Sequence, residues 1–474
     1  PLLQLRLSAG DGLPAIGGGH SALSHGLRQI RRDTMFLPYG KGHIEFDAGK
    51  NHTVLSPDYA GIRADRAGID IVRSAMEKPT GSRRLFELSK GKRTCTVIIS
   101  DHTRPVPSRD ILPVMLSELR QGNSNIEITL LVATGLHRQT TADELRYKLG
   151  DSIFGRERIA VHDCDDKENM VYLGQLPSGS PLYVNRIAAE ADLLVSEGFI
   201  EPHFFAGFSG GRKSVLPGVS GRLTVLGNHC SSFIDHPCAT TGVLENNPIH
   251  EDMKAAARMA GLAFIVNAII DENKHTVAAF AGDPIAAHEA GCAYVKKYFT
   301  VDAIPADIVV TTNGGMPLDG NIYQCVKGLT AAEATANVGG IIIIVAECAD
   351  GKGGEAFYST LKNCNSPAEL YDEIMAVPQD KTIPDQWQSQ ILVRVLKKHR
   401  VIFVTRPELK ETVEEMKMAY AESIADAMAM ARKMKGENAS VTVIPDGVSV
   451  IVRKNLGYKS PVQYKTELSF LYYG

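Results

Sequence analysis

Several signals that define whole classes of protein are missing from this chain. No uninterrupted apolar run approaches the ~20 residues that a membrane-spanning helix needs, and no apolar segment near the start has the form of a signal peptide. The eight cysteines include no C-x-x-C pair, which argues against zinc knuckles and a disulfide framework and favours reduced thiols. A net charge of −3 gives no electrostatic footprint for nucleic acid. We therefore expect a cytoplasmic protein that binds neither membranes nor nucleic acid.

The length of the chain predicts more than one domain, because 474 residues exceed the size of one ordinary hydrophobic core. The first 34 residues show no sustained hydrophobic period, so we expect 1–34 to be a disordered leader or extension and the fold to begin near Met35. We assign an N-terminal catalytic and cofactor-binding domain to 35–298, a C-terminal domain to 299–460 and a tail to 461–474. Composition leaves the oligomeric state open.

Between these ends, apolar β-branched runs alternate with helical patterns. Strands are expected at 94–100, 126–133, 192–198, 307–312, 340–346, 400–405 and within 441–452. Helices are expected at 110–121, 140–149, 286–298 and 412–435, with Thr140 or Thr141 as the N-cap of the second. Strands that alternate with helices are typical of parallel sheets with crossover connections. The sequence therefore predicts an α/β fold in both domains.

Polar residues directly follow three of the expected strands. Asp101 to Arg104 come after the first strand, His137 after the second, and Glu201 to His203 after the third. Because ligands of open parallel sheets bind outside the carboxyl ends of the strands, these clusters should meet at one edge. A plainer interpretation stays open for the first cluster: Asp101 could cap the next segment, or pair with Arg104 as a structural salt bridge.

The segment Gly207-Phe-Ser-Gly-Gly-Arg-Lys-Ser214 combines glycines, two cations and a hydroxyl. Glycines let backbone N–H groups approach an anion, and Arg212 and Lys213 supply positive charge, so the segment predicts a phosphate site. It is no Walker A loop, because that motif needs glycine immediately before the lysine and Arg212 stands there. Downstream, His229 offers a metal ligand or a proton carrier.

Taken together, six motifs resemble those of the nickel-pincer lactate racemase family. They are Asp-x-Thr-Arg-Pro at 101–105, Gly-Leu-His-Arg at 135–138, Pro-His at 202–203, Ser-Gly-Gly-x-Lys-Ser at 209–214, Asn-His at 228–229 and Tyr-Gln-x-x-Lys at 323–327. They occur in that family's order and spacing. The resemblance implies two α/β domains with mainly parallel sheets and an active site in the cleft between them. It also implies a nickel-bearing pyridinium-3-thioamide-5-thiocarboxylate mononucleotide as cofactor, made by dedicated cofactor-synthesis enzymes.

Matched position by position, the resemblance implies a role for each site residue. Lys213 would bear the cofactor through its thioamide, His229 would be the nickel ligand, and His137 and His203 would be the two catalytic bases. The other residues would contact the cofactor (Asp101, Arg104, Ser209, Gly210, Gly211 and Ser214) or the substrate (Arg104, Tyr323, Gln324, Lys327 and Trp387).

The resemblance implies an isomerase, a racemase or epimerase of a small 2-hydroxy acid, with lactate as the leading expectation. One histidine would take the hydroxyl proton while hydride leaves C2 for the cofactor. The planar 2-oxo acid would then turn, and hydride and proton would return to the opposite face. The motifs belong to the shared cofactor machinery, so they leave the tail of the substrate open.

Residue chemistry alone leaves two alternatives. One is a metal-dependent hydrolase with a three-histidine site made of His137, His203 and His229. The 25 residues between His203 and His229, and the lack of an H-E-x-x-H motif, disfavour it. The other is a nucleotide-binding module without catalysis, in which two of these histidines would have no task.

Overall fold

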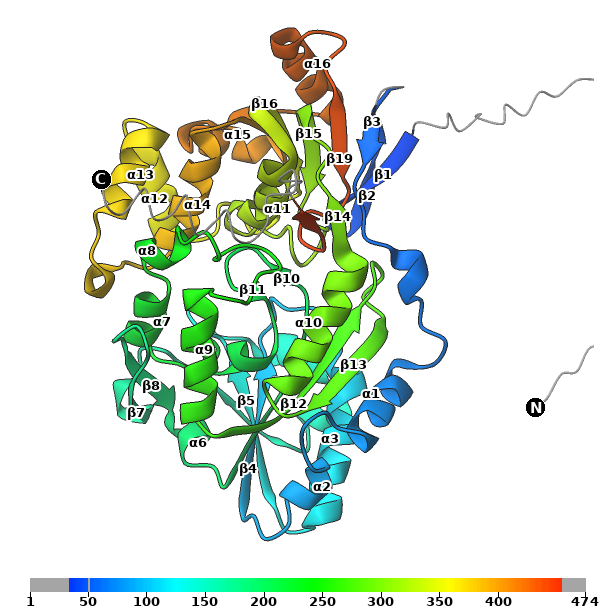
Figure 1. Cartoon of the computed structure of the whole chain (residues 1–474), viewed down its shortest axis with the longest axis vertical. Coiled ribbons are helices and arrows are strands. Elements are labelled where there is room, and N and C mark those ends of the chain that lie inside the picture. Colours follow the sequence, from blue (N-terminus) through cyan, green and yellow to red (C-terminus); the bar gives the residue numbers. More distant parts are fainter. Residues whose placement is uncertain (1–33, 50–51, 454–474) are drawn as a thin grey trace, which may run out of the picture.

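A computed structural model describes residues 34–49 and 52–453 and contains two α/β units, each built around a six-stranded sheet (Figure 1). The leader and tail expected at 1–34 and 461–474 lie outside the described residues, apart from Thr34. Within the described part, no helix combines the length and apolarity needed to cross a membrane.

The sheet of the first unit has the order β13-β12-β9-β4-β5-β6, and only β13 runs antiparallel to its neighbour. Its strands are β4 (Thr94–Ser100), β5 (Glu127–Ala133), β6 (Arg158–Val161), β9 (Leu193–Phe199), β12 (Leu262–Ile270) and β13 (Thr276–Gly282). The strands expected at 94–100, 126–133 and 192–198 are thus confirmed. Two hairpins flank this sheet: β7 (Met170–Gln175) with β8 (Pro181–Asn185), and β10 (Pro202–His203) with β11 (Gly207–Phe208).

Helices cover both faces of this sheet, which explains why β4 is apolar throughout. Val97 and Ile99 pack in the core under α1 and α3, whereas Ile98 packs in the core under α9. The helices of the unit are α1 (Gly68–Glu77), α2 (Leu85–Leu88), α3 (Ser108–Gly122), α4 (Ala142–Leu149), α5 (Asp151–Phe154), α6 (Arg186–Ala189), α7 (Arg222–Asn228), α8 (Ser231–Ile234), α9 (Pro248–Met259) and α10 (Ala286–Phe299). The N-cap of α4 is Thr141, whose side chain and that of Glu144 form a reciprocal capping box.

The second sheet is parallel throughout, in the order β18-β17-β16-β15-β19-β3. Its strands are β3 (His52–Val54), β15 (Ala306–Thr312), β16 (Ala336–Val345), β17 (Arg400–Val404), β18 (Ala419–Ala421) and β19 (Val441–Ile444). The edge strand β3 comes from the start of the chain, as does the hairpin of β1 (Thr34–Tyr39) and β2 (Gly42–Asp47) that packs on the same core. The domain limits 35–298 and 299–460 stay a prediction, but strand pairing joins 52–54 to the second sheet.

The helices of the second unit are α11 (Ile322–Thr335), α12 (Glu355–Asn363), α13 (Pro367–Met375), α14 (Gln386–Leu396), α15 (Lys410–Glu415) and α16 (Ile424–Lys435). The single helix predicted for 412–435 is wrong. Lys417 takes a left-handed φ of +65° that ends α15, the next residues pair with β17 as β18, and Ser423 caps a new helix. A short strand pair, β14 (Thr300–Asp302) with β20 (Ile451–Arg453), closes the unit.

The two units contact each other through α8 of the first and α13 and α14 of the second (Figure 1). Gln390 on α14 donates to the Ser231 carbonyl on α8 at 2.9 Å. One apolar cluster runs through both units and includes Leu216 and Val225 from the first and Ile391 from the second. Because this apolar core is continuous, the contact between the two units is part of the folded structure. The small hairpin β10–β11 lies beside it, in the middle of Figure 1.

Candidate active site

The predicted meeting of the post-strand clusters is confirmed for the clusters that follow β4 and β5. β4 and β5 are parallel neighbours, so the loops that follow them emerge at the same edge of the sheet. There Asp101 Oδ2 lies 2.6 Å from His137 Nδ1, and Asp101 Oδ1 accepts from the Thr103 hydroxyl at 2.7 Å. Asp101 therefore pairs with His137, and no ion pair with Arg104 forms among the described side chains.

The partner of His137 fixes which ring nitrogen carries the proton. Burial alone would raise the pKa of Asp101, but the His137 ring, Arg104 and Thr103 outweigh it and hold the pKa well below its usual range. An ionised carboxylate only accepts hydrogen bonds, so Nδ1 of His137 is the donor and Nε2 is left as a base. The structure thus prepares His137 to accept a proton.

His203 has a different environment. Its Nδ1 accepts the Ala206 N–H at 3.2 Å, and its Nε2 lies 3.2 Å from Lys213 Nζ. Burial, followed by the charges of Lys213 and Lys327, lowers the pKa of His203 well below its usual value. Burial among these cationic side chains therefore keeps His203 neutral.

Lys213 itself sits among cations and is buried. Burial is the main cause that lowers its pKa well below that of an ordinary lysine, and Arg212, Arg104 and Lys327 lower it further. The Phe205 ring lies 5.6 Å from Nζ. The side chain is thus set up as a neutral amine, the nucleophilic form of lysine.

The structure corrects the predicted task of Arg212. Its guanidinium is completely buried and faces the interior of its own loop. Its N–H groups donate to the carbonyls of Ala206 (2.7 Å), Phe208 (2.8 Å) and Ser209 (3.3 Å) and to His250 Nδ1 (3.0 Å). These donors are consumed by the loop, so Arg212 builds the loop and does not offer its charge to an anion.

The other polar groups of the loop also hold it in shape. The Ser214 hydroxyl donates to the Gly211 carbonyl at 2.9 Å, the Gly211 N–H donates to Asn267 Oδ1 at 2.8 Å, and the Ser209 hydroxyl donates to the end of β9 at 2.9 Å. Gly210 has a φ of +74°, and a Cβ there would lie 2.8 Å from Asn267 Oδ1, so only glycine fits. Their predicted contact with a cofactor phosphate stays a prediction.

His229 follows α7 and is 4% exposed. Its Nδ1 donates to the Val225 carbonyl at 3.0 Å, which leaves Nε2 unprotonated in the neutral ring. Burial and the charge of Lys213 lower its pKa to about 3, so the ring stays neutral across the ordinary pH range. The rings of Phe205 and Trp387 pack edge-on against it, with centroids 5.2 and 4.9 Å away. A neutral imidazole with a free Nε2 is the form that binds metals.

The second unit contributes α11 and α14 to the same place. Trp387 Nε1 donates to the Tyr323 hydroxyl at 3.2 Å, so the tryptophan joins His229 to α11. The amide oxygen of Gln324 is buried and accepts no hydrogen bond from the described residues. Burial and Arg104 lower the pKa of Lys327 to about 7. Lys327 lines a small pocket together with Glu201, His203, Phe204, Thr241 and Val448, so the pocket has walls from both units.

Two residues of the site could not be predicted from the sequence. Glu201 belongs to the polar cluster after the third expected strand, but its type and spacing suggested no role. Its carboxylate lines the pocket. Asp385 precedes α14 with a left-handed φ of +64°, and its carboxylate hydrogen-bonds the Tyr323 hydroxyl. Nothing in the sequence marks Asp385, because the signal is a backbone conformation.

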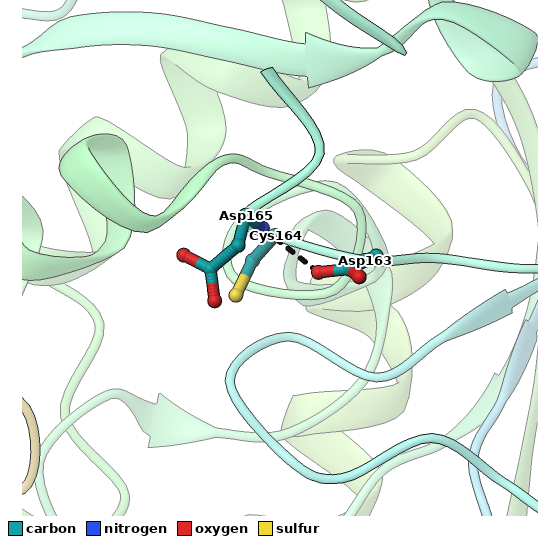
Figure 2. A group of neighbouring side chains, drawn as sticks. All are labelled: Asp163, Cys164 and Asp165. Carbon is teal, nitrogen blue, oxygen red and sulfur yellow. Dashed lines mark hydrogen bonds between the residues drawn. The ribbon is translucent and has the colours of Figure 1, made fainter. Parts of the chain in front are cut away.

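The geometry argues against a three-histidine metal site. Among the described residues, the only group of three potential ligands whose atoms lie within 4.8 Å of one another is Asp163, Cys164 and Asp165, so the histidines 137, 203 and 229 do not form one. That acidic group, shown in Figure 2, is a surface turn in which Asp163 accepts the Asp165 N–H at 2.9 Å. Both carboxylate oxygens of Asp165 already bind Arg222, at 2.6 and 2.5 Å. This group is accounted for without a metal.

Comparisons with known proteins agree with this architecture. Residues 39–242 match the lactate racemase N-terminal domain, and residues 301–452 match the lactate racemase C-terminal domain. A lactate racemase of Thermoanaerobacterium thermosaccharolyticum is 50% identical over 420 residues, which cover 88% of this chain and 99% of that protein. A lactate racemase of Lactiplantibacillus plantarum is 51% identical over 425 residues, with the same coverage of 88% and 99%.

Two solved structures extend the comparison to the fold. The lactate racemase apoprotein from T. thermosaccharolyticum superposes with a TM-score of 0.83 at 49% identity and covers 89% of this chain and 100% of its own. A Thermotoga maritima protein superposes with a TM-score of 0.61 at 18% identity, over 81% of this chain and 97% of its own, which supports the fold alone.

The two α/β units and the site between them are those of an isomerase that acts on a small molecule. The chain belongs to the lactate racemase family.

Proposed function

We propose that the protein interconverts the two enantiomers of a 2-hydroxy acid, with lactate as the first substrate to test. The observation that carries this proposal is the pair His137 and His203, whose rings are held in different ways. Asp101 holds His137, whereas His203 lines the small pocket and contacts the Ala206 N–H and Lys213. A racemase needs a proton acceptor and a proton donor on opposite faces of one carbon, and imidazole can serve as either near neutral pH. The named activity of the relatives supports lactate.

We infer that the site holds a nickel-pincer mononucleotide, because three features of the chain fit that group. A neutral, buried lysine amine suits an amide-type link, and burial together with the nearby Arg104, Arg212 and Lys327 favours this neutral form. His229 presents an unprotonated Nε2, a donor that nickel accepts. The orphaned amide oxygen of Gln324 has no partner within the described chain. When bound, this cofactor supplies an acceptor for the hydride at C2 of the substrate.

The residues of the chain then bind and orient the substrate. Arg104 offers a planar fork and Lys327 a point charge for the carboxylate. His137 takes the hydroxyl proton at Nε2, and the buried carboxylate of Asp101 stabilises the resulting imidazolium.

His203 handles the proton on the opposite face. Burial is the main cause that lowers its pKa, so the ring is neutral. Because Nδ1 accepts the Ala206 N–H, the ring proton is on Nε2, which lies 3.2 Å from Lys213 Nζ, beside the residue proposed to bear the cofactor.

The test is to produce the protein together with the cofactor-synthesis enzymes, which are its expected cellular partners in the cytoplasm. The peptide that contains Lys213 should carry a mononucleotide-sized mass adduct, and chiral chromatography should show conversion of either lactate enantiomer into the other. Lys213→Ala should lose adduct, nickel and activity together. Lys381→Ala, at a side chain 73% exposed, is the matched control and should keep all three. An adduct on another residue, or full activity in Lys213→Ala, would overturn the proposal.

A further inference from the structure

Glu201 contributes its carboxylate to the wall of the small pocket between the two units. The residue directly follows β9, and two backbone bonds hold it: its N–H donates to Ser209 Oγ at 2.9 Å, and its carbonyl accepts the Ser209 N–H at 3.0 Å. Pro202 then fixes the chain direction as the first residue of β10. The side chain therefore starts from a fixed backbone, and it lines the same small pocket as Lys327.

The charges around this pocket are mostly positive. Arg104, Lys213 and Lys327 influence one another electrostatically, and Lys274 from the β12–β13 turn adds a further cation near Glu201. Asp101 is the other carboxylate that acts on Lys327, and it is engaged by His137 and Thr103. Glu201 is thus the one carboxylate of this described cluster that makes no hydrogen bond or ion pair with another side chain.

We propose that Glu201 is a positioning residue that keeps Lys327 charged, and so sets the pH range over which the site holds a carboxylate substrate. The inference rests on the proposed function, in which Lys327 binds the substrate carboxylate. Glu201 acts through Lys327 and does not exchange a proton with the substrate.

The electrostatics of Lys327 support this role. Burial and Arg104 lower its pKa to about 7, and Glu201, Asp101 and Cys325 act in the opposite direction. Glu201 in turn is influenced by Lys327, Arg104, Lys274 and Asp446, while burial raises its own pKa. With its ammonium titrating near neutrality, Lys327 depends on Glu201, the carboxylate that no other side chain of the cluster engages, to stay protonated where an enzyme works.

The experiment compares Glu201→Gln, Glu201→Asp and wild type, with Glu272→Gln as a control at an exposed carboxylate of the same unit. The first readout needs neither cofactor nor substrate. It is the titration of Lys327 by NMR of protein with ¹³C-labelled lysine side chains, assigned with Lys327→Arg. The second is the pH dependence of KM and kcat for lactate in cofactor-loaded enzyme.

In Glu201→Gln, Lys327 should titrate at lower pH than in wild type. KM should rise about tenfold at pH 8 and approach the wild-type value near pH 5, where the lysine is charged in both proteins. kcat should change much less than KM. Glu201→Asp should restore most of the effect, and Glu272→Gln should show none of it.

Three results would overturn the inference: an unchanged Lys327 titration, a KM equal to or below wild type at every pH, and a KM raised equally at all pH values. A KM below wild type would mean that Glu201 repels the substrate, and a uniform rise would point to lost structure. If wild type did not racemise lactate at all, the proposed function would fail, while the titration would still decide what Glu201 does to Lys327.

Discussion

Replacing Arg212 by methionine should destabilise the first unit although no substrate or cofactor atom is expected to touch it. The change removes the donors for the carbonyls of Ala206, Phe208 and Ser209, which lie in a completely buried site. Each buried acceptor left without a partner costs about 1–3 kcal/mol. Methionine regains some apolar packing and removes a buried charge. We therefore expect the free energy of unfolding to fall by at least about 3 kcal/mol, the lower end of the sum for three acceptors.

Thermal unfolding of the cofactor-free protein measures this loss. For a unit of this size, 1 kcal/mol corresponds to roughly 2–4 °C, so the unfolding transition of the first unit should fall by about 6 °C or more. Arg222→Met is the control, since this arginine is 34% exposed and pairs with the 60% exposed Asp165. Such a pair contributes about 0–1 kcal/mol, so Tm should move by no more than about 4 °C. If both variants melted alike, the assignment of Arg212 as the centre of the loop would be wrong.

Two further predictions concern ionisation. Asp101→Asn should lower kcat about 10²–10⁴-fold with little change in KM, because His137 loses the partner that fixes its tautomer and stabilises its charged form; a retained kcat in the racemisation assay would contradict this. His162 and His250 are buried, and burial is the main cause that lowers their pKa values to about 4 and about 3. Their folded-state pKa values are depressed, so their contribution to the free energy of unfolding is complete above the unfolded pKa of ~6.5. This contribution is lost as pH falls, by about 4 kcal/mol in total at pH 5. Melts between pH 8 and 5 should show this decline, with a shallower slope in His162→Gln; an equal slope would refute the assignment.

Much of the architecture could be predicted because local pattern and tertiary structure agree. The run at 94–100 is apolar on both faces of the strand, and the fold covers both faces of the sheet with helices. The strand could therefore be predicted from composition alone. Likewise Thr141 and Glu144 form a capping box from adjacent residues, which needs no distant partner.

The failures share a cause in long-range contacts. The segment 412–435 reads as one helix, but pairing with β17 converts its middle into a strand. Arg212 reads as a free cation, because the side chain lies inside its own folded loop only when that loop packs against the distant His250 and His288. Local sequence indicates the secondary-structure preference of a segment. It does not indicate which distant groups will accept hydrogen bonds from its side chains.

The same limit applies to the site. Histidines and lysines were found because residue type suggests their chemistry. The sequence predicted no role for Glu201 and gave no sign of Asp385, because the surroundings of both residues come from both units. The assigned roles of these residues remain predictions until the variants above are measured.

The path of β3 determines how the protein can be divided. This strand pairs with β19 through His52, Thr53 and Val54, and the chain then leaves for the first unit and returns only after α10. A single cut near residue 299 would therefore leave one fragment with a strand that has no sheet. It would leave the other fragment with β19 as a bare edge, a surface prone to pairing between molecules. An autonomous second unit has to be assembled by fusing the segment around 34–55 to 300–453, and the remaining insert 56–299 is what could be excised or exchanged as one piece.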